Sequence, residues 1–171
     1  TQSFTITVGA TNDAPVITDV EPTLTTLEDT LGSVTLNAND IDGDQLTWSV
    51  SVPASNGTAV VSGNGDSQTA TYTPNADFNG SDSFTVQVSD GTATDTVVVN
   101  VTVDAVNDAP VVTSTAITTA TEDTAYAYTV MATDVDDDTL SYSLSVAPEG
   151  MNIDSNTGAI TWTPENGVTN E

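Results

Sequence analysis

An aspartate-rich turn that leads directly into an alternating apolar segment occurs twice, and it constrains the fold more than any other feature. The first copy reads DIDGDQLTWSV from Asp40, and the second reads DVDDDTLSYSL from Asp134. Apolar side chains at every second position are typical of a half-buried β-strand. The apolar positions correspond pairwise: Leu46 and Leu140, Trp48 and Tyr142, Val50 and Leu144. The chain therefore repeats a cluster of carboxylates at the start of a strand.

This cluster allows two interpretations. Asp and Gly are ordinary turn residues, so it could be a solvated acidic turn. It could instead hold Ca²⁺, which takes roughly six to eight hard oxygen ligands. Carboxylates this close repel each other unless they are neutralised, and the chain has no Lys, Arg or His. We favour calcium. The spacing is not that of an EF-hand, because Ser51 and Ser145 stand where its Glu would be and a strand follows.

The acidic composition narrows the possible partners and compartment. Asp and Glu number 25 among 171 residues, so the formal net charge is −25. A chain without basic residues cannot neutralise phosphates, which excludes a nucleic-acid surface. The same lack argues against docking on anionic membranes, which uses Lys and Arg. No apolar run is long enough to insert into a membrane. Bound divalent cations would relieve the self-repulsion. We therefore expect an extracellular protein, in a medium where calcium is abundant.

Two further motifs recur with nearly the same spacing and divide the chain. Asn12-Asp13-Ala14-Pro15 returns from Asn107, and Glu28-Asp29-Thr30 returns from Glu122. A repeat of about 95 residues built of short strands has the size of one β-sandwich. We expect an all-β chain with two tandem Greek-key sandwiches of the Ig-like or cadherin-like kind. Their expected extents are 1–10 for an orphan closing strand, 11–106 for the first sandwich and 107–171 for the second.

Alternation and turn residues locate the strands within each repeat. The first repeat should have strands near 16–24, 33–38, 45–52, 57–61, 68–73, 82–88 and 94–103. The second should have strands near 111–119, 126–132, 139–146, 151–154 and 159–163. The second repeat thus lacks closing strands, which would expose an edge. Residues 1–8 alternate like the closing strand of the first repeat.

The motifs together resemble the cadherin-like and Ig-like tandem repeats of bacterial extracellular adhesins. The first repeat resembles the bacterial Ig type through TYTPNADFNGSDSFTVQVSDGTATDTVVVNVTV, and the second resembles the dystroglycan-type cadherin-like form through APEGMNIDSNTGAITWTP. The resemblance implies Greek-key sandwiches with Ca²⁺ held where consecutive domains meet.

The resemblance also implies which residues hold the ions. At the junction between the repeats the implied ligands are Glu28, Asp82, Asp104, Asn107, Asp108, Asp134, Asp136 and Asp138. An incomplete half-junction at the start of the chain has Asn12, Asp13, Asp40, Asp42 and Asp44, and one at the end has Glu122. The half-junctions would complete each other if chains or repeats were joined head to tail.

We carry two functional hypotheses forward. The first is an extracellular structural or adhesive unit, rigidified by Ca²⁺ and joined head to tail into a fibre or long array. It would be either a window of a long tandem protein or a subunit whose strand 1–8 inserts into the open second domain of the next unit. The second is a carbohydrate- or surface-binding module, whose candidate residues are Trp48, Tyr72, Tyr126, Tyr128 and Trp162. The competing explanation for these aromatic residues is a place in the core.

An enzyme is not expected from this composition. The chain contains no His, Cys, Lys or Arg, and so lacks the residues of most nucleophile–base pairs and phosphate clamps. A pair of carboxylates could still hydrolyse a glycosidic bond if it lay in a cleft. The carboxylates of this chain fall instead in the turns of small sandwiches.

Overall fold

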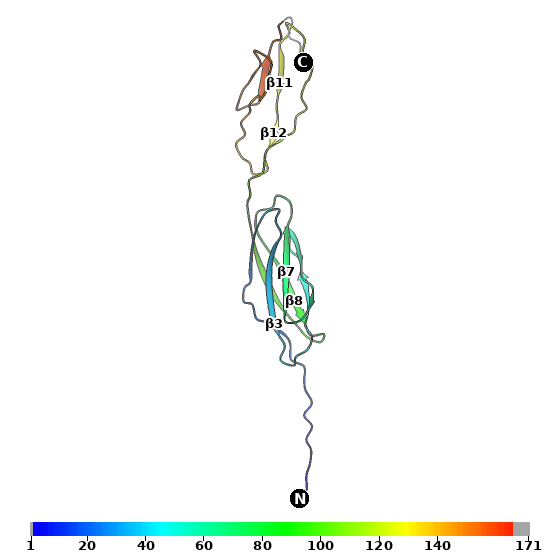
Figure 1. Cartoon of the computed structure of the whole chain (residues 1–171). Coiled ribbons are helices and arrows are strands. Elements are labelled where there is room, and N and C mark those ends of the chain that lie inside the picture. Colours follow the sequence, from blue (N-terminus) through cyan, green and yellow to red (C-terminus); the bar gives the residue numbers. More distant parts are fainter. Residues whose placement is uncertain (1, 166–171) are drawn as a thin grey trace. The chain divides into compact units, whose positions relative to one another are not determined.

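The computed structural model describes residues 2–165, and Thr1 and residues 166–171 lie outside the described part. The described residues form strands and no helix, which confirms the all-β prediction. The chain divides into two compact units, Thr1–Val106 and Asn107–Glu171, called unit 1 and unit 2 below (Figure 1). Within residues 2–165, no helix has the length and apolar character needed to cross a membrane.

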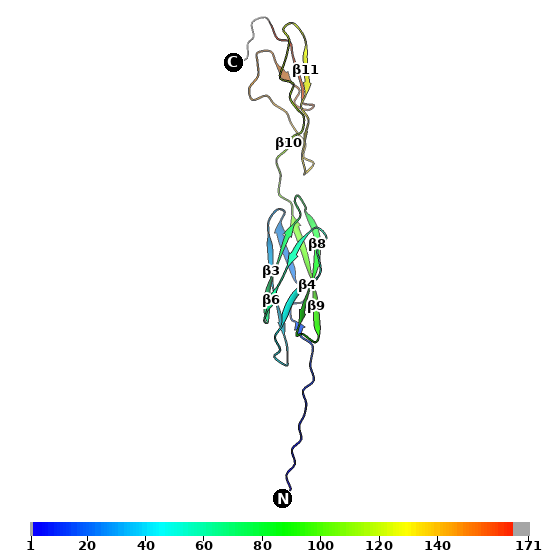
Figure 2. The ribbon, with the colours of Figure 1, turned by 90° about the vertical axis from the view of Figure 1, so that its right-hand side faces the viewer.

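Unit 1 is a sandwich of two sheets (Figure 2). The first sheet has the order β1-β3-β7-β5, with β1 at Val16–Ile17, β3 at Gly32–Asn39, β7 at Ser67–Pro74 and β5 at Gly57–Val60. The second has the order β2-β9-β8-β4-β6, with β2 at Thr23–Leu27, β9 at Thr94–Asp104, β8 at Gly80–Ser89, β4 at Thr47–Val52 and β6 at Gly63–Asn64. Neighbouring strands are antiparallel except β2 and β9, which run parallel.

The core of unit 1 is filled by every second residue of its strands. In β8 the inward residues Phe84, Val86 and Val88 are at most 1% exposed. Tyr72 of β7 is fully buried, and its ring stacks on that of Phe84 with centroids 6.3 Å apart. Val and Thr dominate these strands, as expected for residues that suit a pleated, half-buried surface. The two inner faces therefore close over one continuous apolar core.

One segment of the first repeat, predicted to form a single strand, forms parts of two strands in the structure. The segment 16–24 contributes β1 to one sheet and β2 to the other. Between them Glu21 has a left-handed backbone with φ of 51°, and Pro22 cannot donate a ladder hydrogen bond. The chain therefore crosses from sheet to sheet at this point.

Unit 2 has shorter strands in two small sheets. β10 (Val111–Val112) pairs with β12 (Ala132–Thr133), and β14 (Ala159–Trp162) lies between β11 (Tyr126–Thr129) and β13 (Asn152–Ile153). Among the described residues of unit 2, the buried apolar side chains are those of Ile160 and Pro164.

Two segments predicted to be strands are not in a sheet. The first is 139–146, which corresponds to β4 of unit 1. β4 pairs with β8, whereas the described part of unit 2 has no strand that pairs with 139–146. The second is 1–8, where residues 2–8 form no strand and Thr1 is not described. A ladder needs a partner, and neither segment has one within residues 2–165.

The Phe84 side chain is predicted to carry much of the stability of unit 1. Phe84→Ala leaves a cavity in a closed core, so we expect a loss of about 3–5 kcal/mol in the free energy of unfolding. Ser83→Ala, on the exposed face of the same strand, should change it by less than about 0.5 kcal/mol. Denaturant unfolding followed by Trp48 fluorescence in a Trp162→Phe background measures both. Equal losses would contradict the assignment of the inward face.

Candidate metal centre

Three carboxylates gather in the loop between β3 and β4. The N–H of Asp42 donates to Oδ1 of Asp40 at 2.9 Å, and the N–H of Asp44 reaches the same oxygen at 3.4 Å. Gly43 between them adopts φ of 75°, a conformation that glycine takes without steric cost. The loop therefore wraps around the Asp40 side chain. One carboxylate oxygen from each of Asp40, Asp42 and Asp44 lies within 4.8 Å of the others.

The preceding linker is attached to this loop. The N–H of Asp13 donates to Oδ2 of Asp42 at 2.7 Å. The side-chain amide of Asn12 donates to the carbonyl of Asp13 at 2.9 Å. Asn12, Asp42 and Asp44 also line a hollow of about 320 Å³. The structure thus brings together at one end of unit 1 all five residues predicted for the first half-junction. We call this set the Asp40 cluster: Asn12, Asp13, Asp40, Asp42 and Asp44.

One oxygen of the Asp40 cluster is buried without a hydrogen-bond donor. It is Oδ2 of Asp40, the oxygen that the loop N–H groups do not contact. A buried carboxylate oxygen that finds no donor is costly, and this chain has no cationic side chain to pair with it. Three clustered carboxylates with one buried oxygen free suit a hard divalent cation. The residues present therefore fit Ca²⁺.

Asp90 is a further acidic residue at this end, and the sequence analysis did not single it out. Its Oδ2 accepts a hydrogen bond from the Asn12 side chain at 2.9 Å. The N–H of Ala93, the amide of Asn12 and the N–H of Thr92 hold the pKa of the Asp90 carboxyl below its ordinary value. Asp90 therefore remains charged and positions Asn12. The Ser89-Asp90-Gly91 turn gave no signal of this contact in the sequence.

Unit 2 repeats the same loop geometry. The N–H groups of Asp136 and Asp138 approach Oδ1 of Asp134 at 3.0 and 3.5 Å. The N–H of Asp108 donates to Oδ2 of Asp136 at 2.7 Å, as Asp13 does to Asp42. The amide of Asn107 donates to the carbonyl of Asp108 at 2.8 Å. The residues predicted for the near side of the inter-repeat junction thus lie together within unit 2.

The far end of unit 1 holds two more predicted ligands. Glu28 is only 3% exposed, and its Oε1 accepts a hydrogen bond from the N–H of Val106. Its own N–H donates to the carbonyl of Asp104 at 3.0 Å, beside the end of β9. Glu28 and Asp104 are therefore neighbours. Their convergence with the set in unit 2 stays a prediction, as does a metal-binding role for the exposed Glu122.

Asp82 is engaged by protein donors. Its Oδ1 accepts from the N–H groups of Ser55 and Ser83, and its Oδ2 accepts from the N–H of Asn56 and the hydroxyl of Tyr72. Burial alone would raise the pKa of Asp82, but these four hydrogen bonds outweigh it and leave the pKa lowered. Burial and the Asp82 carboxylate raise the pKa of Tyr72 in turn. Asp82 ties a loop to the core, and its role as a metal ligand stays a prediction.

The aromatic candidates for carbohydrate binding divide into two groups. Trp48 and Tyr72 are 4% and 0% exposed, so they belong to the core of unit 1 and offer no surface for stacking. The indole N–H of Trp48 donates to the carbonyl of Gly65 at 2.7 Å. Tyr126 and Trp162 contact edge to face in unit 2 with centroids 6.5 Å apart. The hypothesis keeps these two and Tyr128, all partly buried.

Comparison with known families accounts for this architecture. Residues 12–102 match a family model described as "Bacterial Ig domain". The chain belongs to the bacterial Ig domain family. Residues 109–171 match a second model, described as "Putative Ig domain". Bacterial Ig domains are typically non-catalytic and are usually found outside the cell or on its surface. Among curated proteins, none matches this sequence.

Solved structures support the same fold. The EC1-2 fragment of human protocadherin-24, in its form II crystal, has 22% identity and a TM-score of 0.55, covering 92% of this chain and 83% of that one. This likeness confirms the expected resemblance to cadherin-like tandem repeats at the level of fold. The endo-fucoidan hydrolase MfFcnA4 has 25% identity and a TM-score of 0.48 over 95% of this chain. The chain spans only about a quarter of that hydrolase, 26% of its length.

The Asp82 hydrogen bonds predict a specific acid sensitivity of unit 1, the bacterial Ig domain. Its pKa in the fold lies below the ordinary value of 3.8, so its stabilisation is complete above pH 3.8 and is lost as the pH falls through the lowered pKa. Asp82→Asn should cost about 1–3 kcal/mol at pH 7 and flatten the loss of stability below pH 4. Thermal unfolding across pH 2–7 measures this.

Asp66→Asn is the matched control, because it removes one exposed carboxylate from the same unit. Its profile of melting temperature against pH should follow the wild type. A wild-type slope in Asp82→Asn would contradict the role given to Asp82.

Proposed function

We propose that this chain is a non-enzymatic extracellular structural or adhesive unit, whose Ig-like domains bind Ca²⁺ at their ends and are joined head to tail. The observation that carries the proposal is the buried Asp40 Oδ2, which lies in a group of three carboxylates without a hydrogen-bond donor. The composition supports it, because no cationic side chain can replace the metal.

The energetics favour a bound ion over a solvated turn. Two unit charges about 4 Å apart near a protein surface repel by about 4 kcal/mol, and three carboxylates make three such pairs. A divalent cation among them converts this repulsion into attraction. An ion that binds only the folded state adds about 2.7 kcal/mol when its free concentration is about 100 times its Kd. Extracellular modules bind Ca²⁺ with Kd values of about 10⁻⁴–10⁻³ M, so a free concentration about ten times Kd would add about 1.4 kcal/mol per ion.

The hydrogen bonds suggest how ions would stiffen the chain. Before each unit, the linker Asp donates its N–H to the middle carboxylate of that unit's own loop: Asp13 to Asp42, and Asp108 to Asp136. An ion that orders the loop would therefore also order the linker. Ca²⁺ would then restrict the hinge between successive domains, which is what a fibre or a long extended array requires.

Calcium should bind the Asp40 cluster and stabilise unit 1. We expect Ca²⁺ to raise the melting temperature of the full chain and a chelator to lower it, because the ion offsets carboxylate repulsion only in the fold. The double substitution D40N/D42N should weaken Ca²⁺ binding at this site by at least about tenfold, since it removes two charged ligands. Isothermal titration calorimetry measures the affinity.

Asp66→Asn again provides the control, with a carboxylate lost outside the cluster. Its affinity should match the wild type. If Asp66→Asn weakened binding as much as D40N/D42N, or if Ca²⁺ left the melting temperature unchanged, the Asp loops would be solvated turns only.

Calcium should also narrow the range of arrangements between the two units. The chain has no cysteine, so spin labels can be placed at Ser83→Cys in unit 1 and Thr161→Cys in unit 2, both exposed. Pulsed electron resonance should give a narrow distance distribution in Ca²⁺ and a broad one in chelator. Adding D134N/D136N should keep the distribution broad in Ca²⁺, because it disrupts the loop that holds the linker. A width that does not depend on Ca²⁺ would rule out rigidification.

A further inference from the structure

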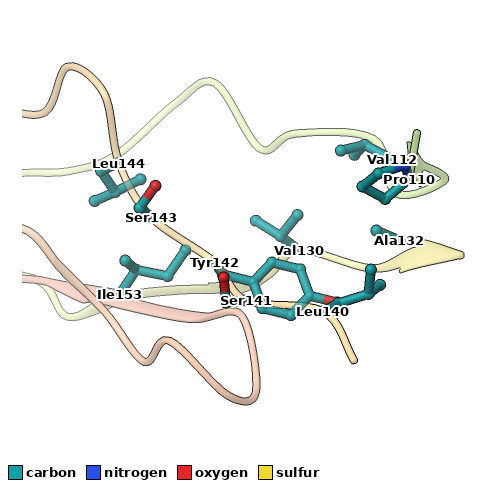
Figure 3. A pocket seen from close by; sticks show the side chains of 10 residues that line it. All are labelled: Pro110, Val112, Val130, Ala132, Leu140, Ser141, Tyr142, Ser143, Leu144 and Ile153. Atoms are coloured by element: carbon teal, nitrogen blue, oxygen red, sulfur yellow. The ribbon is translucent and has the colours of Figure 1, made fainter. Parts of the chain in front are cut away.

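Unit 2 contains an apolar hollow of about 270 Å³ that its own strands leave open (Figure 3). Its lining includes Val112, Val130, Leu140, Tyr142, Leu144 and Ile153. Val130 and Tyr142 lie beside each other in the middle of it (Figure 3). We call this hollow the unit 2 groove. None of its lining residues is charged.

One wall of the groove is the segment 139–146. It has the alternating pattern of a strand but pairs with no strand among the described residues. In 139–146, Leu140, Tyr142 and Leu144 are half-buried and the residues between them are exposed. The N–H of Tyr142 donates to the carbonyl of Ser155 at 2.9 Å. Within residues 2–165 this is the one backbone hydrogen bond of the segment. Unpaired N–H and C=O groups along an edge favour the addition of another strand.

Unit 1 shows which strand would fill this place. The counterparts of Leu140 and Tyr142 are Leu46 and Trp48, which are 0% and 4% exposed. They are covered because β4 pairs with β8, whose inward residues complete the core. The strand that the unit 2 groove would accept is therefore one with the inward pattern of β8.

The chain carries a second copy of that pattern at its start. Residues 3–8 read SFTITV and Ser83–Val88 read SFTVQV, so that Phe4, Ile6 and Val8 match Phe84, Val86 and Val88. The three residues of β8 are buried, whereas Phe4, Ile6 and Val8 are 84%, 74% and 87% exposed. These three exposed side chains at alternate positions would form one apolar face if the segment paired as a strand.

We propose that residues 3–8 of one copy of this chain add as a strand to 139–146 of a second copy. The proposal rests on the proposed function, because it gives the head-to-tail joining its contact. The β4–β8 register sets the pairs: Trp48 with Val88, Ser49 with Gln87 and Val50 with Val86. By correspondence, Val8 lies opposite Tyr142, Thr7 opposite Ser143, and Ile6 opposite Leu144. The apolar side chains of residues 4, 6 and 8 then face the groove.

Charge supports a second copy as the occupant. With a net charge of −25 and no basic residue, two copies repel through most of their surface. Residues 1–12 carry no Asp or Glu, and the lining of the groove carries none either. This neutral segment and this neutral groove can therefore meet without bringing carboxylates together.

A cysteine cross-link tests both the contact and its register. The wild type has no cysteine, so two singly substituted full chains, Thr7→Cys and Ser143→Cys, can be mixed and oxidised. Directly opposed residues reach disulfide geometry, whereas residues displaced by two positions do not. We expect the mixture to form at least about ten times more cross-linked dimer than a mixture of Thr5→Cys with Ser143→Cys. Equal yields, or no dimer, would overturn the proposal.

A matched pair of charge substitutions tests the face that enters the groove. Ile6→Asp places a carboxylate in the apolar lining, while Thr7→Asp adds the same charge on the opposite face of the strand. By sedimentation velocity, Ile6→Asp should weaken self-association by about tenfold or more and Thr7→Asp should have little effect. Equal weakening would mean that charge alone drives the change, and would overturn the proposal. So would a wild type that remains monomeric, which would leave the groove to another segment of a longer parent chain.

The same samples separate this proposal from calcium binding. Ile6→Asp should bind Ca²⁺ with wild-type affinity, because residue 6 is not part of the Asp40 cluster. The Thr7→Cys and Ser143→Cys chains should still cross-link when each also carries D40N/D42N, because the groove contains no metal ligand. If the wild type bound no Ca²⁺ but the cysteine variants still cross-linked, the proposed function alone would be refuted. If the wild type bound Ca²⁺ but the cysteine variants did not cross-link, strand addition alone would be refuted.

Discussion

Repulsion between carboxylates that no side chain can neutralise is the constraint on which the rest of this structure depends. In unit 1 the sandwich places its charge mostly in loops. The exposed positions along β8 and β7 carry Ser, Thr and Gln, and two hydroxyls, Thr35 and Thr69, meet across the strands. The inward carboxylates of Asp82 and Asp95 accept backbone N–H groups, such as the 2.8 Å bond from Ile17 to Asp95. The two sheets can therefore pack without burying an unpaired carboxylate of their strands between them.

Backbone N–H groups stabilise carboxylates in this chain, as Lys and Arg side chains do in other proteins. Asp40, Asp90, Asp134 and Asp154 each accept two of them within their own turn. Such bonds stabilise the charged form, and they hold the pKa of Asp154 low through the N–H groups of Thr157 and Asn156. They do not remove the net charge, however. Oδ2 of Asp40 is buried and accepts no hydrogen bond, so a cation would contribute most at this oxygen.

The Asp loops and the closure of the sandwich are independent features of the two units. Unit 1 is closed by β8 and β9, and unit 2 has no counterpart to them among its described residues. The loop hydrogen bonds of Asp134 and Asp40 nevertheless agree in partners and closely in length. Asp137 adopts the left-handed backbone, with φ of 59°, that Gly43 holds in unit 1. Local turn chemistry is thus sufficient to form the loop around Asp40 or Asp134, whereas the closed core of unit 1 depends on β8 and β9.

The sequence by itself determined the fold class, the repeat and most strands of unit 1, because alternation and turn residues act over a few neighbouring positions. It also located the Asp40 cluster, since the ligands lie within one loop and the linker is a repeated motif. Only the tertiary structure decided that 16–24 divides between two sheets, that Asp82 serves the core, and that Asp90 reaches Asn12. It likewise decided that 139–146 remains outside a sheet. These outcomes depend on partners distant in sequence, and an alternating pattern shows that a segment can pair without showing that a partner strand is there.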